Sequence, residues 1–547
     1  MTTHEVTNVV PRPVGHDVYA GDPALQASVE RWVPADRRSD VEALGPLAGS
    51  EQAQDWADRA NTHSPVLRTH DRIGRRVDEV EFDPSWHELL AVAVGHGLTA
   101  EPWTRPAGSG AHAARAAGFI VWSQVEQGHL CPVSMTYAAA PALATTPPLA
   151  SGWLPGLASR EYDPGLREHH AKAGLLAGMG LTEKQGGSDV RVNTTWAERH
   201  DGGPVEGGTT FRLTGHKWFC SAPMSDVFLV LAQTDAGLGC FLVPRVLADG
   251  SPNPFALQRL KDKLGNRSNA SSEIELDGTW GALVGEEGRG IRTILEMVSA
   301  TRLDCILGSA ATMRAALSRA IHHTRHRRAF GALLVDQPLM RNVLADLALE
   351  SEAASLLGMR LARAVDDGET ELTRLGVALG KFWVCKRTSP MVAEALECLG
   401  GNGYVEENGL ARLYREAPLN SIWEGSGNVN ALDVLRAMVR EPASVAALGK
   451  ELALARGSHA VLDEAIDGVE TAAAQALSPD APWSARRVVE RLAITLQAGL
   501  LVRHAPAEVA DAFVASRLGG DHGATFGTLG RLTPEATTNI LDRALPA

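Results

Sequence analysis

The sequence predicts a mainly α-helical protein with a middle β-domain, and three observations support this fold class. Segments between about residues 86 and 172, such as WHELLAVAVGHGL, place apolar residues three and four apart, which is the spacing of amphipathic helices. About 100 residues then follow as short runs rich in β-branched and aromatic residues, typical of a small β-barrel or sandwich. From Gly290 the helical spacing returns and persists through most of the remaining chain.

Four domains follow from this order along the 547 residues. We expect an N-terminal arm with a helical domain over 1–177, a β-barrel domain over 178–288, a helical domain over 289–440 and a further helical domain over 441–547. The first 60 or so residues are rich in Pro, Gly and charge, so we expect them to wrap another surface. The last domain has helix starts such as Thr533-Pro534, where Thr caps a helix and Pro occupies its first turn.

The composition narrows the class of protein. A net charge of -13 argues against a protein whose main ligand is a nucleic-acid backbone, because such binding depends on concentrated Lys and Arg. No secretion signal or long apolar run is present, so we expect a cytoplasmic protein without a membrane association. The six cysteines are scattered without a CxxC pair, which favours buried free thiols over disulfides or a zinc site.

Two glycine-containing stretches flank the start of the β-domain. In Gly178–Asp189 (GMGLTEKQGGSD) the glycines let the backbone approach a ligand closely, and Thr182 and Ser188 offer hydroxyls; a tight interdomain loop is the alternative interpretation. In Gly215–Pro223 (GHKWFCSAP) two aromatic residues adjoin Ser221. This pattern suits an aromatic cofactor that is hydrogen-bonded at its edge, and a strand with two core aromatics is the alternative.

A third stretch, Ile321–Gly331 (IHHTRHRRAFG), holds the most concentrated positive charge in the sequence. Its three arginines could neutralise a pyrophosphate or contact nucleic acid, and a solvated helix face is the alternative. His322 and His326 have the spacing of two ligands on one helix face, but no third ligand or general base accompanies them as in HExxH. We therefore expect no metal site.

The fourth stretch is Leu399–Asn430. Its GGNGY run follows a helical pattern and not a strand, so it lacks the context of a dinucleotide-binding Rossmann motif. We expect these glycines to end a helix and to admit a bulky group. In IWEGSGN, Glu424 lies between a tryptophan and a Gly-Ser-Gly turn, a poorly solvated setting that suits a general base. A favourable charge near a helix N-terminus is the alternative.

In this order, the four stretches resemble the acyl-CoA dehydrogenase family over about residues 85–440, and within it the AidB subgroup, known for the adaptive response to DNA alkylation. The segments that match this subgroup are MGLTEKQGGSDVRVNTT, RLKDKLGNRSNAS and NSIWEGSGN, and the extra C-terminal helical domain also fits it. The resemblance implies a helical domain, a β-barrel and a four-helix bundle over 289–440. It also implies FAD held between the last two and across a subunit interface, and hence a homo-oligomer, which we expect to be a tetramer.

The resemblance assigns residues of the β-domain to the flavin. It implies that five residues form the loop over the flavin: Met179, Gly180, Leu181, Thr182 and Ser188. It implies that Phe219 and Ser221 lie on the strand beside the reactive nitrogen of the flavin. The usual Trp-Ile-Thr of the family is here Trp-Phe-Cys-Ser, so Ser221 takes the place of threonine as the donor at the flavin edge.

The same resemblance assigns residues of the helical domain over 289–440. Arg327, in the R-x-x-F-G pattern, resembles the arginine that reaches the FAD pyrophosphate of a neighbouring subunit. Three glycines match the GGxG turn near the adenosine: Gly400, Gly401 and Gly403. Four residues match the aromatic-Glu-Gly-Thr signature, with Glu424 as the catalytic base: Trp423, Glu424, Gly425 and Ser426.

The implied activity is that of an FAD-dependent oxidoreductase. The carboxylate of Glu424 removes the α-proton of an acyl thioester, expected to be an acyl-CoA, and the flavin takes the β-hydrogen as hydride. An electron-transferring flavoprotein is the expected acceptor. Lys184 and Gln185 depart from the family's TEPGAGSD loop near where a CoA tail would lie, so the sequence supports FAD more firmly than CoA.

Two other functions stay open. The first is a DNA-associated role in the response to alkylation damage, with weak or vestigial dehydrogenase activity; Arg486, Arg487 and Arg491 could form a basic stripe, although the C-terminal domain is acidic overall. The second is an oxidase or monooxygenase acting on a substrate that is not a CoA ester, because one fold supports several flavin chemistries. The acyl chain length and the role of the C-terminal domain are not determined by the sequence.

Overall fold

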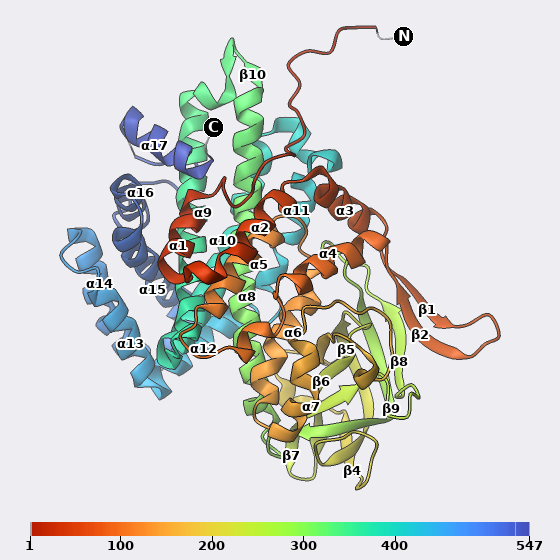
Figure 1. Cartoon of the computed structure of the whole chain (residues 1–547). Coiled ribbons are helices and arrows are strands. Elements are labelled where there is room, and N and C mark those ends of the chain that lie inside the picture. The colour runs from red at the N-terminus through yellow and green to blue at the C-terminus, as the bar shows by residue number, and fades with distance from the viewer. Residues whose placement is uncertain (1–2, 531, 546–547) are drawn as a thin grey trace. The chain divides into compact units, whose positions relative to one another are not determined.

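A computed structural model describes residues 3–530 and 532–545 (Figure 1). The chain divides into two compact units. The barrel unit comprises residues 52–106 and 125–304, and the bundle unit comprises residues 1–51, 107–124 and 305–547. The division into four domains stays a prediction, although residues 441–547 lie in the same compact unit as residues 305–440.

The barrel unit begins with helices and one hairpin. Its helices are α3 (Glu51–Thr62), α4 (Pro84–Gly95), α6 (Leu130–Leu143) and α7 (Pro147–Leu157). Asp83 caps α4 by accepting a hydrogen bond from the amide of Ser85. The hairpin of β1 (Val66–His70) and β2 (Arg76–Glu81) was not predicted, because its strands are largely exposed and their charged residues hide the apolar alternation of a strand.

Seven strands form the middle β-domain: β3 (Ala177–Gly180), β4 (Trp196–Arg199), β5 (Thr210–Ser221), β6 (Val227–Thr234), β7 (Gly237–Pro244), β8 (Phe255–Leu260) and β9 (Ser271–Val284). The order β6-β4-β5-β9-β7 closes on itself because β7 also pairs with β6. Outside this ring, β3 pairs with β6 and β8 pairs with β9. The predicted β-domain is therefore a closed barrel. Four phenylalanines fill its core: Phe211, Phe228, Phe241 and Phe255.

The bundle unit is helical. Its N-terminal helices are α1 (Pro23–Trp32), α2 (Ser39–Ala48) and α5 (Ala111–Ser123), and its long helices are α8 (Gly290–His326, from Cys305 on), α9 (Pro338–Asp366) and α10 (Thr370–Glu397). A short hairpin, β10 (Arg328–Ala329) and β11 (Ala332–Leu333), joins α8 to α9 at their tips (Figure 1). The helices α11 (Leu410–Glu416) and α12 (Gly427–Arg440) complete this part.

Five C-terminal helices pack on α9 and α10 or on one another: α13 (Pro442–Ala453), α14 (Ala460–Gln475), α15 (Ala481–His504), α16 (Ala507–Phe513) and α17 (Pro534–Ala544). The predicted cap of α17 is confirmed, since the hydroxyl of Thr533 accepts a hydrogen bond from the amide of Ala536. All six cysteines are buried thiols outside any disulfide, as predicted. Among the described residues, no helix is long and apolar enough to cross a membrane.

Candidate functional site

The loop after β3 is anchored by a buried glutamate. Glu183 is fully buried, and its carboxylate accepts hydrogen bonds from Lys217 Nζ at 2.7 Å and from the amides and hydroxyls of Thr194 and Thr195. Burial would raise the pKa of Glu183, but the ammonium of Lys217 and these hydrogen bonds lower it well below its ordinary value. Glu183 is therefore an ionised anchor for the loop and not a proton-transfer group.

The predicted flavin-loop residues differ in how far they are exposed to solvent on this loop. Gly180 is buried, Met179, Leu181 and Thr182 are half-buried, and Ser188 is exposed. The carbonyl of Leu181 accepts a hydrogen bond from the side chain of Asn193 at 2.8 Å, and the carbonyl of Thr182 accepts one from the amide of Trp218 at 2.8 Å. The loop and the end of β5 therefore form one connected surface.

The end of β5 presents alternate residues to opposite sides. Phe219 is 48% exposed, whereas Cys220 is fully buried. Burial raises the pKa of Cys220 to about 12, so its thiol is an inert core group. Ser221 Oγ lies 2.9 Å from Ser271 Oγ on the neighbouring strand β9. An exposed aromatic ring and a hydroxyl thus share one side of the strand.

Lysine side chains from the segment after β8 approach this surface. Lys261 Nζ lies 3.1 Å from the centroid of the Trp218 ring and also pairs with Glu273 at 2.5 Å. Lys263 Nζ donates hydrogen bonds to Ser271 Oγ at 2.9 Å and to the carbonyl of Asn269 at 2.6 Å. Neither lysine was among the predicted site residues.

The loop of the bundle unit that carries Glu424 has an unusual backbone. Glu424 itself has a φ of 57°, in the left-handed region that residues other than glycine rarely adopt. Gly425 follows with a φ of 96°. Such a conformation costs about 1–2 kcal/mol and persists only when surrounding contacts impose it. Ser426 then precedes α12, as the sequence predicts for a turn that opens a helix.

A buried lysine imposes this conformation. Lys381 is 1% exposed, and its Nζ donates hydrogen bonds to the carbonyls of Trp423 at 2.8 Å and Gly425 at 2.5 Å, one on each side of Glu424. The side-chain amide of Asn430 donates a further bond to the carbonyl of Gly425. An ammonium that bridges both flanking carbonyls fixes the backbone of the residue between them.

The side chain of Trp423 is also held from within the bundle. Its indole Nε1 donates to Asn420 Oδ1 at 2.8 Å, and Asn420 Nδ2 donates to Ser309 Oγ on α8 at 3.1 Å. The aromatic residue next to Glu424 is thus oriented by a hydrogen-bond chain that ends on a different helix.

The glycine turn of residues 400–403 follows helix α10, so its helical context is as predicted. Gly400 has a φ of 59°, and neither Gly400 nor Gly401 has an atom within 4 Å of where a side chain would begin. Gly403, in contrast, has no room for one, because a Cβ would lie 2.1 Å from the carbonyl oxygen of Leu396. The turn leaves open space over its first two glycines.

The basic stretch at the end of α8 contacts the N-terminal arm. Arg327 Nη1 donates to the carbonyl of Asn8 at 2.6 Å, which engages one of its five N–H groups. His322 Nε2 and His326 Nδ1 each lie 2.8 Å from a backbone carbonyl oxygen, so these nitrogens are engaged by the backbone. A different group in the described chain, Glu168, His169 and His170, has ligand atoms within 4.8 Å of one another on the surface of the barrel unit.

Three family models match the chain. The model described as "Adaptive response protein AidB N-terminal domain" matches residues 8–164, and those described as the acyl-CoA dehydrogenase middle and C-terminal domains match residues 178–279 and 288–439. The "Putative acyl-CoA dehydrogenase AidB" of Escherichia coli (strain K12) is 47% identical over 85% of this chain and 86% of its own. The chain belongs to the acyl-CoA dehydrogenase family. Its N-terminal match and this relative place it in the AidB subgroup.

Further members of the acyl-CoA dehydrogenase family agree with this assignment. "Acyl-CoA dehydrogenase family member 11" of Caenorhabditis elegans is 30% identical over 85% of this chain and 78% of its own. The crystal structure of Caenorhabditis elegans ACDH-11 in complex with C11-CoA superposes with a TM-score of 0.84 at 27% identity, covering 98% of this chain and 95% of that one. Butyryl-CoA dehydrogenase from Megasphaera elsdenii shares the fold, with a TM-score of 0.60 at 21% identity over 75% of this chain and 99% of that one.

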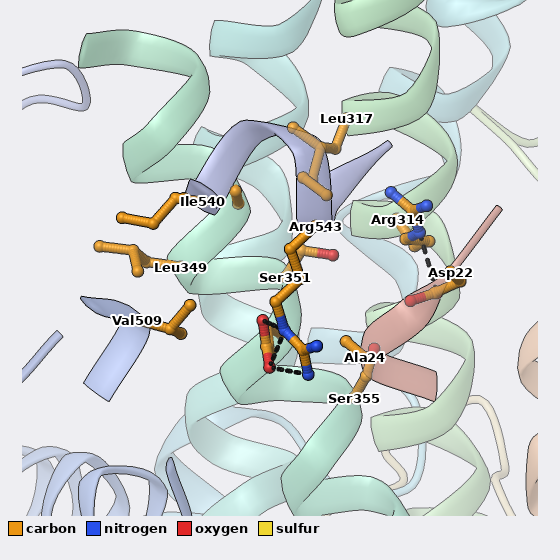
Figure 2. A pocket seen from close by; sticks show the side chains of 13 residues that line it. Asp22, Ala24, Arg314, Leu317, Leu349, Ser351, Ser355, Val509, Ile540 and Arg543 are labelled. Carbon is orange, nitrogen blue, oxygen red and sulfur yellow. Dashed lines mark hydrogen bonds and ion pairs between the residues drawn. The ribbon is translucent and has the colours of Figure 1, made fainter. Parts of the chain in front are cut away.

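A small pocket in the bundle unit lies apart from these family residues. It is lined by α1, α8, α9, α16 and α17, and Arg314 faces Asp22 there (Figure 2). Arg314 Nε donates a hydrogen bond of 2.8 Å to the Asp22 carboxylate. Arg543 of α17 forms three hydrogen bonds with the carboxylate of Glu352 on α9. The cavity of about 20 Å³ has room for a water molecule, and the paired charges link α1 to α8 and α17 to α9.

Each compact unit of this acyl-CoA dehydrogenase family member gathers its own predicted residues. The barrel unit holds Met179 to Ser188 with Phe219 and Ser221, and the bundle unit holds Glu424 and its neighbours with the glycine turn. Sequence reasoning missed the side chains that support them: Glu183, Lys217, Lys263, Ser271, Lys381 and Asn430. Lys217, Ser271 and Lys381 bond partners at least 34 residues away, so no local pattern marks them. Lys263 and Asn430 bond partners within eight residues, in turns that the sequence pattern does not reveal.

Proposed function

We propose that the protein is an FAD-dependent oxidoreductase that dehydrogenates acyl thioesters, with Glu424 as the base. The observation that carries this proposal is the strained backbone of Glu424, which the buried Lys381 holds by hydrogen bonds to the carbonyls of Trp423 and Gly425. Strain of this kind collects at functional sites, where surrounding contacts maintain it. The family supplies the reaction class, and this loop supplies the candidate base.

The residues present suit FAD. On the barrel unit, Phe219 offers an exposed aromatic ring and Ser221 a hydroxyl for the edge of the isoalloxazine. On the bundle unit, the open space over Gly400 and Gly401 and the remaining N–H groups of Arg327 suit an adenosine and a diphosphate. When bound, FAD would accept the β-hydrogen of the substrate as a hydride.

The chain's own contribution is proton transfer and orientation. The carboxylate of Glu424 takes the α-proton, the electrons of that C–H bond form the new trans double bond, and the β-hydrogen leaves with its electron pair. The backbone amide of Glu424 is the proposed donor to the thioester carbonyl, which acidifies the α-proton. Lys381 holds the backbone around Glu424 in place, because it donates hydrogen bonds to the carbonyls of the residues before and after it.

We propose an acyl-CoA as the substrate and an electron-transferring flavoprotein as the acceptor. A relative of 27% identity is named as a complex with C11-CoA, which supports CoA as the carrier. Lys184 adds a cation to the flavin loop, with its Nζ 5.8 Å from the Trp218 ring centroid. Although Lys184 departs from the usual family loop, a cation at this position is compatible with a phosphate-bearing substrate tail.

The test is anaerobic titration of the FAD-loaded protein with a panel of acyl-CoAs, followed by flavin absorbance. Bleaching by at least one acyl-CoA is expected, and Glu424→Gln should keep FAD but slow bleaching by roughly 10² to 10⁴, the usual contribution of a general base. Glu470→Gln, an exposed glutamate on α14, is the matched control and should behave as the unaltered protein. A flavin that no acyl-CoA reduces, or a fully active Glu424→Gln variant, would contradict the proposal. In a separate aerobic reaction without an electron-transferring partner, rapid peroxide formation would instead favour an oxidase.

A DNA-associated role is a second proposal. Helix α15 exposes three arginines, Arg486, Arg487 and Arg491, and Trp483 near them is 96% exposed. Cations beside an exposed aromatic ring suit nucleic acid. Binding to duplex DNA that weakens steeply with salt and is lost in a triple Arg→Gln variant would support this role, and absent binding at low salt would remove it.

We propose that the protein is a cytoplasmic homotetramer. Phe330, at the tip of the β10–β11 hairpin, is 99% exposed, and Leu339 at the start of α9 is 83% exposed. Exposed apolar side chains grouped at one tip are typical of contacts between subunits. Phe330→Asp should lower the molar mass measured by light scattering, because aspartate fits the left-handed turn but not an apolar interface. Leu477→Asp, at another exposed position, is the control, and an unchanged mass for Phe330→Asp would contradict this interface.

A further inference from the structure

Three polar side chains form a chain behind the exposed end of β5. Ser221 on β5 and Ser271 on β9 are directly paired residues of the antiparallel ladder, and their hydroxyl oxygens lie 2.9 Å apart. Lys263 Nζ lies 2.9 Å from Ser271 Oγ and 2.6 Å from the carbonyl oxygen of Asn269. Ser271 is buried, whereas Ser221 is half-buried beside the exposed ring of Phe219.

The chemistry of these groups sets the direction of the hydrogen bonds. An ammonium can only donate, so Ser271 Oγ accepts from Lys263. The proton of Ser271 is then available for Ser221 Oγ, and Ser221 accepts from behind. When Ser271 donates to one lone pair of Ser221, the Ser221 hydroxyl keeps its own proton for a partner on the side on which Phe219 lies.

We propose that Lys263 is a positioning residue that, through Ser271, aims the hydroxyl proton of Ser221 at the reducible edge of the bound flavin. This inference rests on the proposed function, since it needs FAD beside Ser221. A donor aimed at that edge stabilises the electron-rich, reduced flavin more than the oxidised flavin. The chain of Lys263, Ser271 and Ser221 therefore raises the reduction potential of the bound FAD.

The experiment measures the two-electron reduction potential of FAD in the holoprotein against reference dyes. Lys263→Met and Ser271→Ala should each lower the equilibrium constant for reduction about tenfold, which corresponds to about 30 mV for a two-electron couple. Lys263→Gln keeps a donor to Ser271 without the charge and should restore most of the potential. The matched control is Lys450→Met, which removes a lysine charge at an exposed position on α13, in the bundle unit.

A double variant separates positioning from simple charge. If Lys263 acts through Ser221, adding Lys263→Met to Ser221→Ala should change the potential no further. An equal shift in both backgrounds, or no shift for Lys263→Met and Ser271→Ala, would overturn the inference. These outcomes are distinct from failure of the proposed function, which would appear as unaltered protein that binds no FAD or is reduced by no acyl-CoA.

Discussion

Replacing Lys381 by methionine should impair catalysis without removing the base. The change deletes two charge-assisted hydrogen bonds, to the carbonyls of Trp423 and Gly425, and leaves Asn430 as the remaining donor to Gly425. Each such bond contributes about 1.5–3 kcal/mol, more than the roughly 1–2 kcal/mol of strain at Glu424. Without these two hydrogen bonds, the backbone of Glu424 can relax out of the left-handed region.

The expected loss follows from that strain. If relaxation recovers about 1–2 kcal/mol, the competent conformation falls to roughly one molecule in six to one in thirty. We therefore expect kcat for the best acyl-CoA to fall roughly 5-fold to 30-fold, with FAD content retained and substrate affinity little changed.

Stopped-flow reduction by that acyl-CoA measures this loss directly. Lys450→Met, at an exposed position on α13, is the control for removing one lysine charge. A Lys381→Met variant that is folded, carries FAD and reduces it within twofold of the unaltered rate would refute the argument that this lysine holds Glu424 in its active conformation.

Three further predictions concern stability. Burial would raise the pKa of Glu126, but its hydrogen bonds, led by the one with His129, hold the pKa at about 2 against an ordinary 4.5. The ionised carboxylate should therefore contribute about 3 kcal/mol to the free energy of unfolding above pH 4.5, and this contribution should disappear toward pH 2. Urea unfolding of Glu126→Gln should lose this part of the pH dependence. Lys217→Met leaves the ionised Glu183 buried without its partner and should cost about 3–5 kcal/mol by thermal unfolding; a double variant with Glu183→Gln that is equally unstable would contradict the pairing. Arg543→Ala leaves the carboxylate of Glu352 without its donor, so limited proteolysis should release the C-terminal helix faster, and an unchanged cleavage rate would show that other contacts hold α17.

The fold class was predictable because its signals are local. The apolar spacing of residues 86–98 and the strand runs near Thr210–Ser221 depend only on which face of each element is buried. Thr533 and Pro534 start a helix through contacts within one turn. The charged hairpin of Val66–Glu81 was missed because its two strands bury few residues and carry little apolar alternation.

The candidate base and the flavin loops come from a resemblance of motifs in their order along the chain, so the sequence by itself determined which residues to consider. The tertiary structure decided what holds them. Lys381 reaches carbonyls 42 and 44 residues away, and Lys263 acts on Ser221 through the pairing of two strands. The left-handed backbone of Glu424 was equally hidden, because nothing in its residue type favours that conformation. Hydrogen bonds between distant residues depend on helix packing and strand register, which no local pattern encodes.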